Sequence, residues 1–239
     1  MDALYHQQIL QRALGAHVSP RALSAITHAN LQQDDLNGLL FHFEYHFDNC
    51  QFAESLRYIE DQRGLAARAD SVPQAWAAFG RLTHGAQDFY AHSNYVALWL
   101  ERITPHPDPL PIGKAAAGER ETSPASIEAL DPTLLKHPRL VSGRVAWVHE
   151  ALTLIEPLRP WVRRIAPKDS HAYMNLDYPE AGPFFPYAME AAIQRTVVEY
   201  ERTVALMGEE NGEEAVRAFQ GERLREADAR CFVPQTCGD

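Results

Sequence analysis

The chain has 239 residues, of which 46% are hydrophobic and 23% are charged, a balance typical of a globular protein that buries its own core. Its formal net charge is −10, which argues against a broad electrostatic contact with nucleic acid, because phosphate binding needs clustered Lys and Arg. The three cysteines, Cys50, Cys231 and Cys237, form neither a disulfide framework nor a CxxC zinc motif. Cys231 can pair with Cys237, or both can be free thiols. Any zinc site in this chain must therefore use histidines and carboxylates.

The first residues, MDALYHQQILQRALG, carry an acid at position 2 and no apolar core, so they do not resemble a signal peptide. No apolar run approaches the roughly 20 residues that span a bilayer. We expect a soluble protein without a transmembrane segment, either cytoplasmic or exported by a signal-independent route.

Helical periodicity dominates the chain, and no segment alternates as a half-buried strand does. A first helix is expected over 2–15, ending at Gly15, and a second is capped by Ser19 with Pro20 in its first turn. Further helices are expected over 50–68, over one long segment from Pro73 to 103, and over 143–158, 184–207 and 211–229. Residues 104–139 hold seven of the sixteen prolines and are expected to be irregular. The prediction is a single all-α domain over 1–239, a compact multi-helix bundle with one Pro-rich excursion.

The long helix carries the strongest sign of chemistry. Successive helical residues turn by about 100°, so His84, Asp88 and His92 form one stripe about 12 Å long. Zinc binds His and carboxylate at about 2.0–2.2 Å, so one ion cannot take ligands from all three turns. Two metals about 3.5–4 Å apart can share the stripe, with the central carboxylate between them. The remaining ligands must come from other helices, as in metal sites of helical bundles.

Other segments offer further donors. His42 and His46 lie one turn apart if FHFEYHFDNC is helical, and Asp48 follows them; His28, Asp34 and Asp35 lie just upstream, and His6 is on the first helix. Taken singly, each of these is more often a core or surface residue than a ligand. Their occurrence together with the stripe favours a metal site.

The string GRLTHGAQDFYAHSNYVALWL, with AITHAN followed by Asp34, HFDN at 46–49 and SHAYMNLDYP at 170–179, resembles the zinc-dependent phospholipase C superfamily. The similarity is to the branch of bacterial zinc metallophospholipases C and fungal heterokaryon-incompatibility C proteins, distant kin of zinc single-strand nucleases. It covers roughly residues 6–100 and 170–205. The resemblance implies a compact helical bundle with two or three Zn²⁺ at the bottom of a cleft.

Residue by residue, the resemblance implies a first zinc held by Asp34, His46, His84 and Asp88. A second would be held by His92 with His171, and Asp177 could complete it. A third would be held by His6, with Asp88 bridging. His149 and Glu150 compete with His171 and Asp177 for the second zinc. The secreted relatives use an N-terminal Trp at the third zinc, whereas this chain starts MDALYH, and Leu176 stands where Lys is usual.

The implied activity is hydrolysis of phosphatidylcholine or a similar phospholipid to diacylglycerol and a phosphorylated headgroup. Asp34 and Asp88 are the predicted catalytic residues. Asp48 and Asn94 are expected to orient ligands, or simply to make helix and turn hydrogen bonds. Aromatic faces near a quaternary ammonium would suit such a headgroup. The candidates are Phe184, Phe185 and Tyr187, although aromatic residues in such a segment are more often plain core.

Two other functions are compatible with the sequence. A zinc-dependent single-strand nuclease or other phosphodiesterase would use the same metals, but it would need a basic groove, and we expect no nucleic-acid partner. A non-catalytic helical interaction or toxin-like module would keep a structural zinc. Such sites are usually closed and four-coordinate, and the donors here outnumber what one of them uses.

Overall fold

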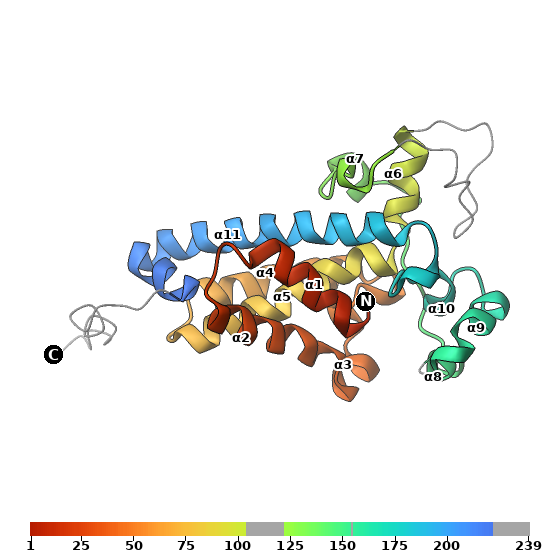
Figure 1. Cartoon of the computed structure of the whole chain (residues 1–239), viewed down its shortest axis with the longest axis horizontal. Coiled ribbons are helices and arrows are strands. Elements are labelled where there is room, and N and C mark those ends of the chain that lie inside the picture. The colour runs from red at the N-terminus through yellow and green to blue at the C-terminus, as the bar shows by residue number, and fades with distance from the viewer. Residues whose placement is uncertain (104–121, 154, 222–239) are drawn as a thin grey trace.

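The computed structural model describes residues 1–103, 122–153 and 155–221 of the chain. Within these ranges the regular secondary structure is helical, and the only β-type pairing consists of two isolated bridges, Ser93 with Ser142 and Arg144 with Ser170. The prediction of an all-α protein is therefore confirmed (Figure 1).

The α-helices of the described residues differ widely in length, from four residues to thirty-six. In chain order they are α1 (Ala3–Leu14), α2 (Pro20–Leu31), α3 (Leu36–Phe41), α4 (Phe52–Ala67), α5 (Val72–His92), α6 (Tyr95–Ile103), α7 (Pro132–Leu135), α8 (Trp147–Thr153), α9 (Arg159–Ile165), α10 (His171–Met174) and α11 (Phe185–Gln220).

Helix α5 lies at the centre of the bundle and packs against α2, α4 and α11, while α1 packs on α2 and α11 (Figure 1). Nearly every side chain from Ala75 to His92 is buried, because neighbouring helices cover α5 on several sides. Such a helix has no solvent-facing stripe on which polar residues can be solvated, so each of its polar side chains needs a partner inside the protein.

Most predicted helices are found within a few residues of their expected bounds. The Ser19 hydroxyl accepts a hydrogen bond from the backbone N–H of Ala22 at the start of α2, as a helix N-cap does. Of the predicted helix over 143–158, the described residues contain only α8 and a 3₁₀ turn at Glu156–Leu158, and a separate helix, α9, begins just beyond the predicted range. The predicted segments 184–207 and 211–229 are one element to Gln220, interrupted only at Gly212, where φ is +79°.

The prediction of one long helix over 73–103 is wrong. Helix α5 ends at His92, Ser93 is extended (φ −106°, ψ 166°), and α6 begins at Tyr95. Asn94 explains the break, because its backbone N–H donates to the Val141 carbonyl and its side chain bonds the Val141 N–H and the Arg139 carbonyl. These long-range bonds compete with continuation of the helix.

The Pro-rich excursion predicted over 104–139 is described only from residue 122 onward, where a 3₁₀ turn at Pro124–Ser126 and the four-residue α7 interrupt irregular chain. Residues 104–121, and the end of the predicted 211–229 helix with Cys231 and Cys237, lie outside the described residues. In the part that is described, no helix is long and apolar enough to cross a membrane.

Helices α8, α9 and α10 lie together beyond one end of the bundle (Figure 1). They have a small hydrophobic cluster of their own, in which Val162, Ala166 and Ala172 are buried. The other buried hydrophobic side chains form one large cluster built largely on α1, α2, α5 and α11. The groove between α8–α10 and the bundle end is where the histidines and aspartates gather.

Candidate metal centre

The stripe predicted on α5 is deeply buried. His84 is 0% exposed, Asp88 1% and His92 5%. The three side chains therefore meet protein groups rather than water, and a carboxylate in such a place must be neutralised by a cation or by hydrogen bonds. The groups they meet come from α1, from the segment 34–48 and from the region after α9, which are far apart in the sequence.

The first donor group consists of Asp34, His46, His84 and Asp88. Nε2 of His84, Nδ1 of His46 and Oδ2 of Asp88 are mutually 3.0 Å apart. Oδ1 of Asp34 lies 3.5 Å from the His84 nitrogen and 3.9 Å from the His46 nitrogen. In a tetrahedral zinc site, bonds of about 2.0–2.2 Å place the ligand atoms about 3.3–3.6 Å apart. The four donors bracket this spacing, so the group fits one such ion.

The donor groups are numbered after the zinc ions predicted for them. The third donor group lies next to the first and consists of His6, His84 and Asp88. Nδ1 of His6 lies 2.6 Å from Oε1 of Gln87, an amide oxygen that only accepts, so Nδ1 carries the proton. Nε2 of His6 then presents a lone pair to Oδ1 of Asp88, 3.2 Å away, and it has no hydrogen-bond partner among the described residues. Two acceptors that face each other in this way repel, and a cation bound between them would remove the repulsion.

Gln87 is itself held from three sides. Its Oε1 also accepts from Nδ2 of Asn30 at 3.3 Å, and its Nε2 donates to Oγ1 of Thr196 at 3.2 Å. The amide therefore cannot turn over without losing a bond, and the His6 tautomer is fixed by this network. Sequence reasoning missed Gln87, for which the only signal was an amide beside Asp88 in an otherwise apolar helix.

The second donor group consists of Asp48, His92 and His171, each of which offers one donor atom within 4.8 Å of the others. Nδ1 of His92 donates to the backbone carbonyl of His46 at 2.9 Å and lies 3.3 Å from Oδ1 of Asp48. Nδ1 of His171 pairs with Oε2 of Glu150 at 2.9 Å, which leaves its buried Nε2 without a hydrogen bond among the described residues. Glu150, expected as a rival ligand, thus contacts His171 directly.

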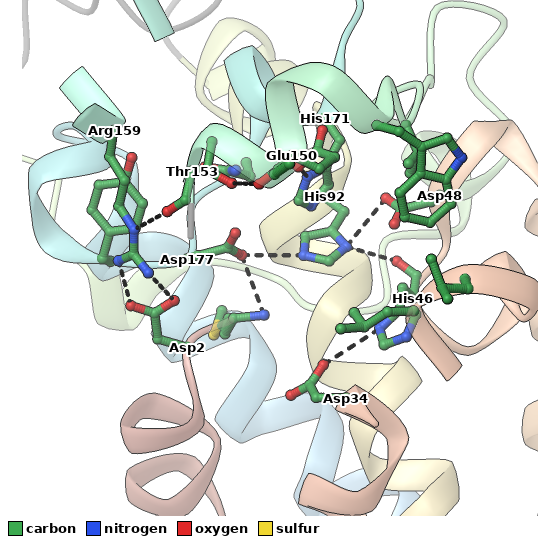
Figure 2. Close-up of a pocket in the computed structure, with 18 of the residues that line it drawn as sticks. Asp2, Asp34, His46, Asp48, His92, Glu150, Thr153, Arg159, His171 and Asp177 are labelled. Carbon is green, nitrogen blue, oxygen red and sulfur yellow. Dashed lines mark hydrogen bonds and ion pairs between the residues drawn. The ribbon is translucent and has the colours of Figure 1, made fainter. Parts of the chain in front are cut away.

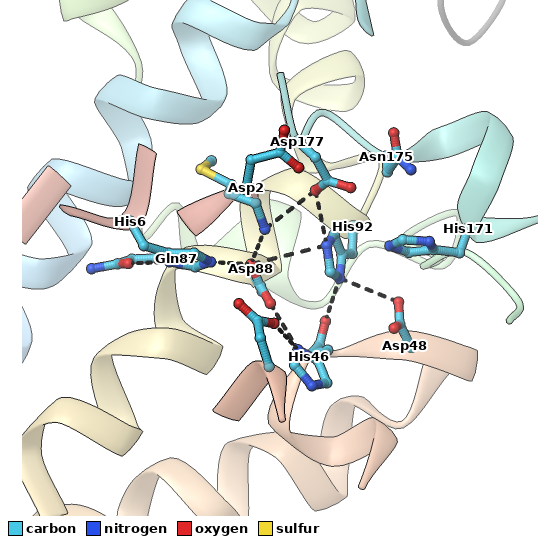
Figure 3. Close-up of polar contacts among 12 residues, drawn as sticks. Asp2, His6, His46, Asp48, Gln87, Asp88, His92, His171, Asn175 and Asp177 are labelled. Atoms are coloured by element: carbon cyan, nitrogen blue, oxygen red, sulfur yellow. Dashed lines mark hydrogen bonds and ion pairs between the residues drawn. The ribbon is translucent and has the colours of Figure 1, made fainter. Parts of the chain in front are cut away.

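Asp177 contacts the other nitrogen of His92, the one that is left free to bind a cation. Its Oδ1 is 3.1 Å from Nε2 of His92 and 3.2 Å from the α-amino group of Met1. The same amino group lies 2.5 Å from Oδ1 of Asp88. Figure 3 shows Asp177, His92, Asp88 and His46 as one connected set of polar contacts. Each of the eight predicted ligands is therefore in contact with at least one other.

The electrostatics of the centre favour positive charge. Burial alone would raise the pKa of Asp88, but the Met1 ammonium and nearby histidines hold it well below its usual value. Burial would likewise lower the pKa of His92, yet Asp88, Asp48 and Asp177 raise it well above its usual value. For the Met1 amine, burial is outweighed by Asp177, Asp88 and Asp34, which raise its pKa to about 11. The carboxylates of the centre thus hold protons on their neighbours, which a divalent cation would displace.

Members of the first and second donor groups line a cleft of about 460 Å³ (Figure 2). Its polar floor includes Asp34, His46, Asp48, His92, His171 and Asp177. Its walls carry apolar side chains from two separate helices, Leu36, Leu39 and Leu40 of α3 and Trp147 and Ala151 of α8. We refer to these five residues as the apolar wall. His84 and Asp88 lie beneath the floor.

Some expected residues are elsewhere. The segment 42–50 is not a helix: Phe47, Asn49 and Cys50 have positive φ, and His42 pairs with Glu44 at 2.8 Å. Phe184 and Phe185 are buried in the hydrophobic core and, with Tyr187, are absent from the described lining of the cleft, which includes the aromatic rings of Trp147 and Tyr178. Phe184 and Phe185 are thus core residues, the alternative that the sequence favoured, because proximity to His171 along the chain does not set which way a ring points.

The fold and the site together define a class of protein: an all-α protein whose buried histidines and aspartates cluster beneath a cleft. A family model described as the VWA7 N-terminal domain matches residues 4–114. This span is a little under half of the chain; it includes His6, Asp34, His46, Asp48 and the stripe on α5, and it ends before His171 and Asp177. The match gives no activity.

No curated protein and no solved structure matches the chain. What the chain can do must therefore be argued from its own residues.

Proposed function

We propose that this protein is a zinc-dependent phospholipase C, which hydrolyses phosphatidylcholine or a similar phospholipid to diacylglycerol and a phosphorylated headgroup. The observation that carries the proposal is the cleft: clustered His and Asp donors form its floor and an apolar wall flanks it. The sequence resemblance of the 84–94 segment to zinc phospholipases C supports the same reading.

The shape and lining of the cleft suit an amphiphile. Small-molecule sites usually measure about 300–1,000 Å³, and this cleft holds about 460 Å³. Leu36 is 77% exposed and Trp147 46% exposed at its walls, and Phe41 and Val148 on the same two helices are 71% and 75% exposed. A phosphate placed at the donors would leave glyceride and acyl chains against this apolar surface, where their burial is favourable.

Zinc supplies the chemistry that phosphodiester cleavage needs, because it lowers the pKa of water towards 7 and stabilises charge on phosphoryl oxygens. The chain's own residues supply the rest. Asp34 is the carboxylate of the first donor group with an exposed side chain, at 33%, so it can accept a proton from water that enters the cleft. Asp88 is buried and faces donors of two groups, so its role is to hold them at a fixed separation.

Charge in the cleft favours a phospholipid over a nucleic acid. Among the described residues that line the cleft, one is an arginine and five are acidic, namely Asp2, Asp34, Asp48, Glu150 and Asp177. The arginine, Arg159, is paired with Asp2 at 2.8 Å. A single strand carries a charge at every nucleotide, and this lining repels the part of it that lies outside the metal ions.

The test is to incubate the full chain, reconstituted with Zn²⁺, with phosphatidylcholine micelles and separately with single-stranded DNA or RNA, each with and without chelator. We expect release of phosphocholine that chelator abolishes. Release of mononucleotides without phosphocholine would establish the nuclease instead. If neither product forms although the protein is fully occupied by zinc, the result would favour the non-catalytic interaction module.

Two leucine variants test the contribution of the apolar wall independently of the metal centre. We expect Leu36→Ser to slow hydrolysis of micellar phosphatidylcholine severalfold while leaving a soluble short-chain substrate nearly unaffected. The matched control is Leu65→Ser on α4, which is also exposed (55%). Equal rates for both variants on micelles would show that the apolar wall takes no part in substrate contact.

A further inference from the structure

Residues 141–145, which we call the strap, form both isolated β-bridges of the described chain, Ser142 with Ser93 and Arg144 with Ser170. Besides its bonds to Asn94 and Asp169, the backbone of the strap makes three hydrogen bonds to backbone groups at or beside members of the second donor group. The Gly143 N–H donates to the His92 carbonyl at 3.0 Å, the Asn49 N–H donates to the Gly143 carbonyl at 2.9 Å, and the His171 N–H donates to the Arg144 carbonyl at 2.9 Å.

These three attachment points coincide with the second donor group. His92 and His171 are two of its members, and Asn49 follows the third, Asp48. A second bond strengthens the contact beside Asp48, because Oδ1 of Asn49 accepts from the Val145 N–H at 2.9 Å. The strap is thus the one described segment bonded to the backbone at or beside every member of the group.

The backbone around Asp48 needs such support. Phe47, Asn49 and Cys50 have φ of 59°, 55° and 58°, a left-handed conformation that Asn tolerates but that is strained for other residues with a side chain. Strain of this kind persists only where surrounding structure over-determines it. The strap bonds Asn49 through both backbone and side chain, and the Ser142 hydroxyl accepts from the Cys50 N–H at 2.9 Å.

Gly143 fixes how closely the strap approaches. A Cβ at this position would lie 2.4 Å from Cα of His171 and 2.7 Å from its backbone nitrogen. Both are backbone atoms, so neither can rotate away, and any larger residue must push the strap and His171 apart. A shift of that kind moves the His171 ring relative to His92 and Asp48.

We infer that the strap is the positioning element of the second donor group, with Gly143 and Asn49 as its positioning residues, and that it sets the affinity of that group for a divalent cation. The inference depends on the proposed function only in taking the second donor group as a metal site. Residues that orient ligands typically change metal affinity about 10–100-fold when mutated. The first donor group has no backbone bond to the strap in the described chain and should be spared.

The experiment is a Zn²⁺ titration of the metal-free full chain by calorimetry, with hydrogen exchange of backbone amides measured in parallel. The sites lost in His171→Ala define the second group. Gly143→Ala introduces the clash, and Asn49→Gly keeps the left-handed backbone accessible but removes the side-chain acceptor. Gly208→Ala is the matched control, because a Cβ there meets only ordinary contacts from 3.7 Å outward.

We expect both strap variants to weaken zinc at the second group at least about tenfold, to leave the first group unchanged, and to speed exchange of the Asn49, Gly143 and His171 amides together. Unchanged affinity in both variants, or losses at both groups in proportion to unfolded protein, would overturn the inference. Metal uptake without hydrolysis would overturn the proposed function alone, and a wild-type chain that takes up no zinc would overturn both.

Discussion

Asp88 is the residue on which two donor groups converge. Its Oδ2 lies 3.0 Å from the nitrogens of His46 and His84, and its Oδ1 lies 3.2 Å from Nε2 of His6. One carboxylate therefore faces two donor groups, as the bridging ligand of a multinuclear site would. His6, by contrast, serves one group only.

We therefore expect Asp88→Asn to lower kcat/KM for phosphatidylcholine more than about 100-fold, and more than any other single ligand change. The amide keeps the volume of the side chain but loses the charge that both groups use. Phosphocholine release and bound zinc are measured together. Asp61→Asn, an exposed acid on α4, is the control for the same chemical change. If His6→Ala proved as damaging as Asp88→Asn, the bridging role would lose its basis.

The residues on α5 could be predicted from the sequence because helical periodicity alone places His84, Asp88 and His92 on one stripe. Their partners could be suggested only by resemblance, since no local pattern brings His6, Asp34 or Asp177 to that stripe. The strap contacts of Asn49 and Gly143 could not be predicted. They depend on a left-handed turn and on the close approach of Gly143 to the backbone of His171, neither of which leaves a periodic signal.

At the scale of elements, α4 and α11 are joined by a buried ion cluster away from the metal centre. Glu199 is 0% exposed, and its carboxylate lies 2.6 Å from Nη2 of Arg63 on α4 and 2.6 Å from Nε of Arg195 on α11. Burial would raise the pKa of Glu199, but Arg195 and Arg63 outweigh it and lower the pKa below its usual value. Removing Glu199 leaves two cations without their common partner.

We expect Glu199→Gln to lower the free energy of unfolding at pH 7 by about 3–5 kcal/mol, the usual cost of breaking a buried ion pair. Because the folded pKa is depressed, the charged carboxylate contributes its full stability above the unfolded pKa of about 4.3. That contribution is lost as the pH falls through the folded pKa. The difference in the free energy of unfolding between the wild type and Glu199→Gln should therefore become smaller in acid.

Urea unfolding between pH 3 and pH 7 measures this difference in the free energy of unfolding. Glu201→Gln, an exposed glutamate on the same helix, is the control and should track the wild type. A difference in the free energy of unfolding that stays constant across this pH range would show that Glu199 is not held ionised by the arginines.

Helix bounds could be read from the sequence where caps and prolines mark them, as at Ser19 and Pro20. The break at Ser93 could not, because the apolar period continues from α5 into α6 and the helix ends where Asn94 bonds to Val141 and Arg139. The break nevertheless matters for the site. It frees the His92 carbonyl to accept from Gly143, so the end of the ligand-bearing helix is also where the strap attaches.

At the scale of the whole molecule, the bundle and the α8–α10 unit contribute different halves of the site. The first and third donor groups come from α1, α5 and the segment 34–46, all within the bundle end, whereas His171 and Glu150 come from α10 and α8. Metal at the second group would therefore link the two parts, and it should raise the stability of the chain through binding to the folded state alone.

The central claim is that these donors form a multinuclear zinc centre. Elemental analysis of the full chain, after reconstitution with Zn²⁺ at neutral pH and removal of free metal, tests it most directly. The account predicts two or three zinc ions per chain, because donors spread over three turns of α5 exceed the reach of one ion. No tightly bound zinc, or a single ion that His84→Ala alone abolishes, would contradict it.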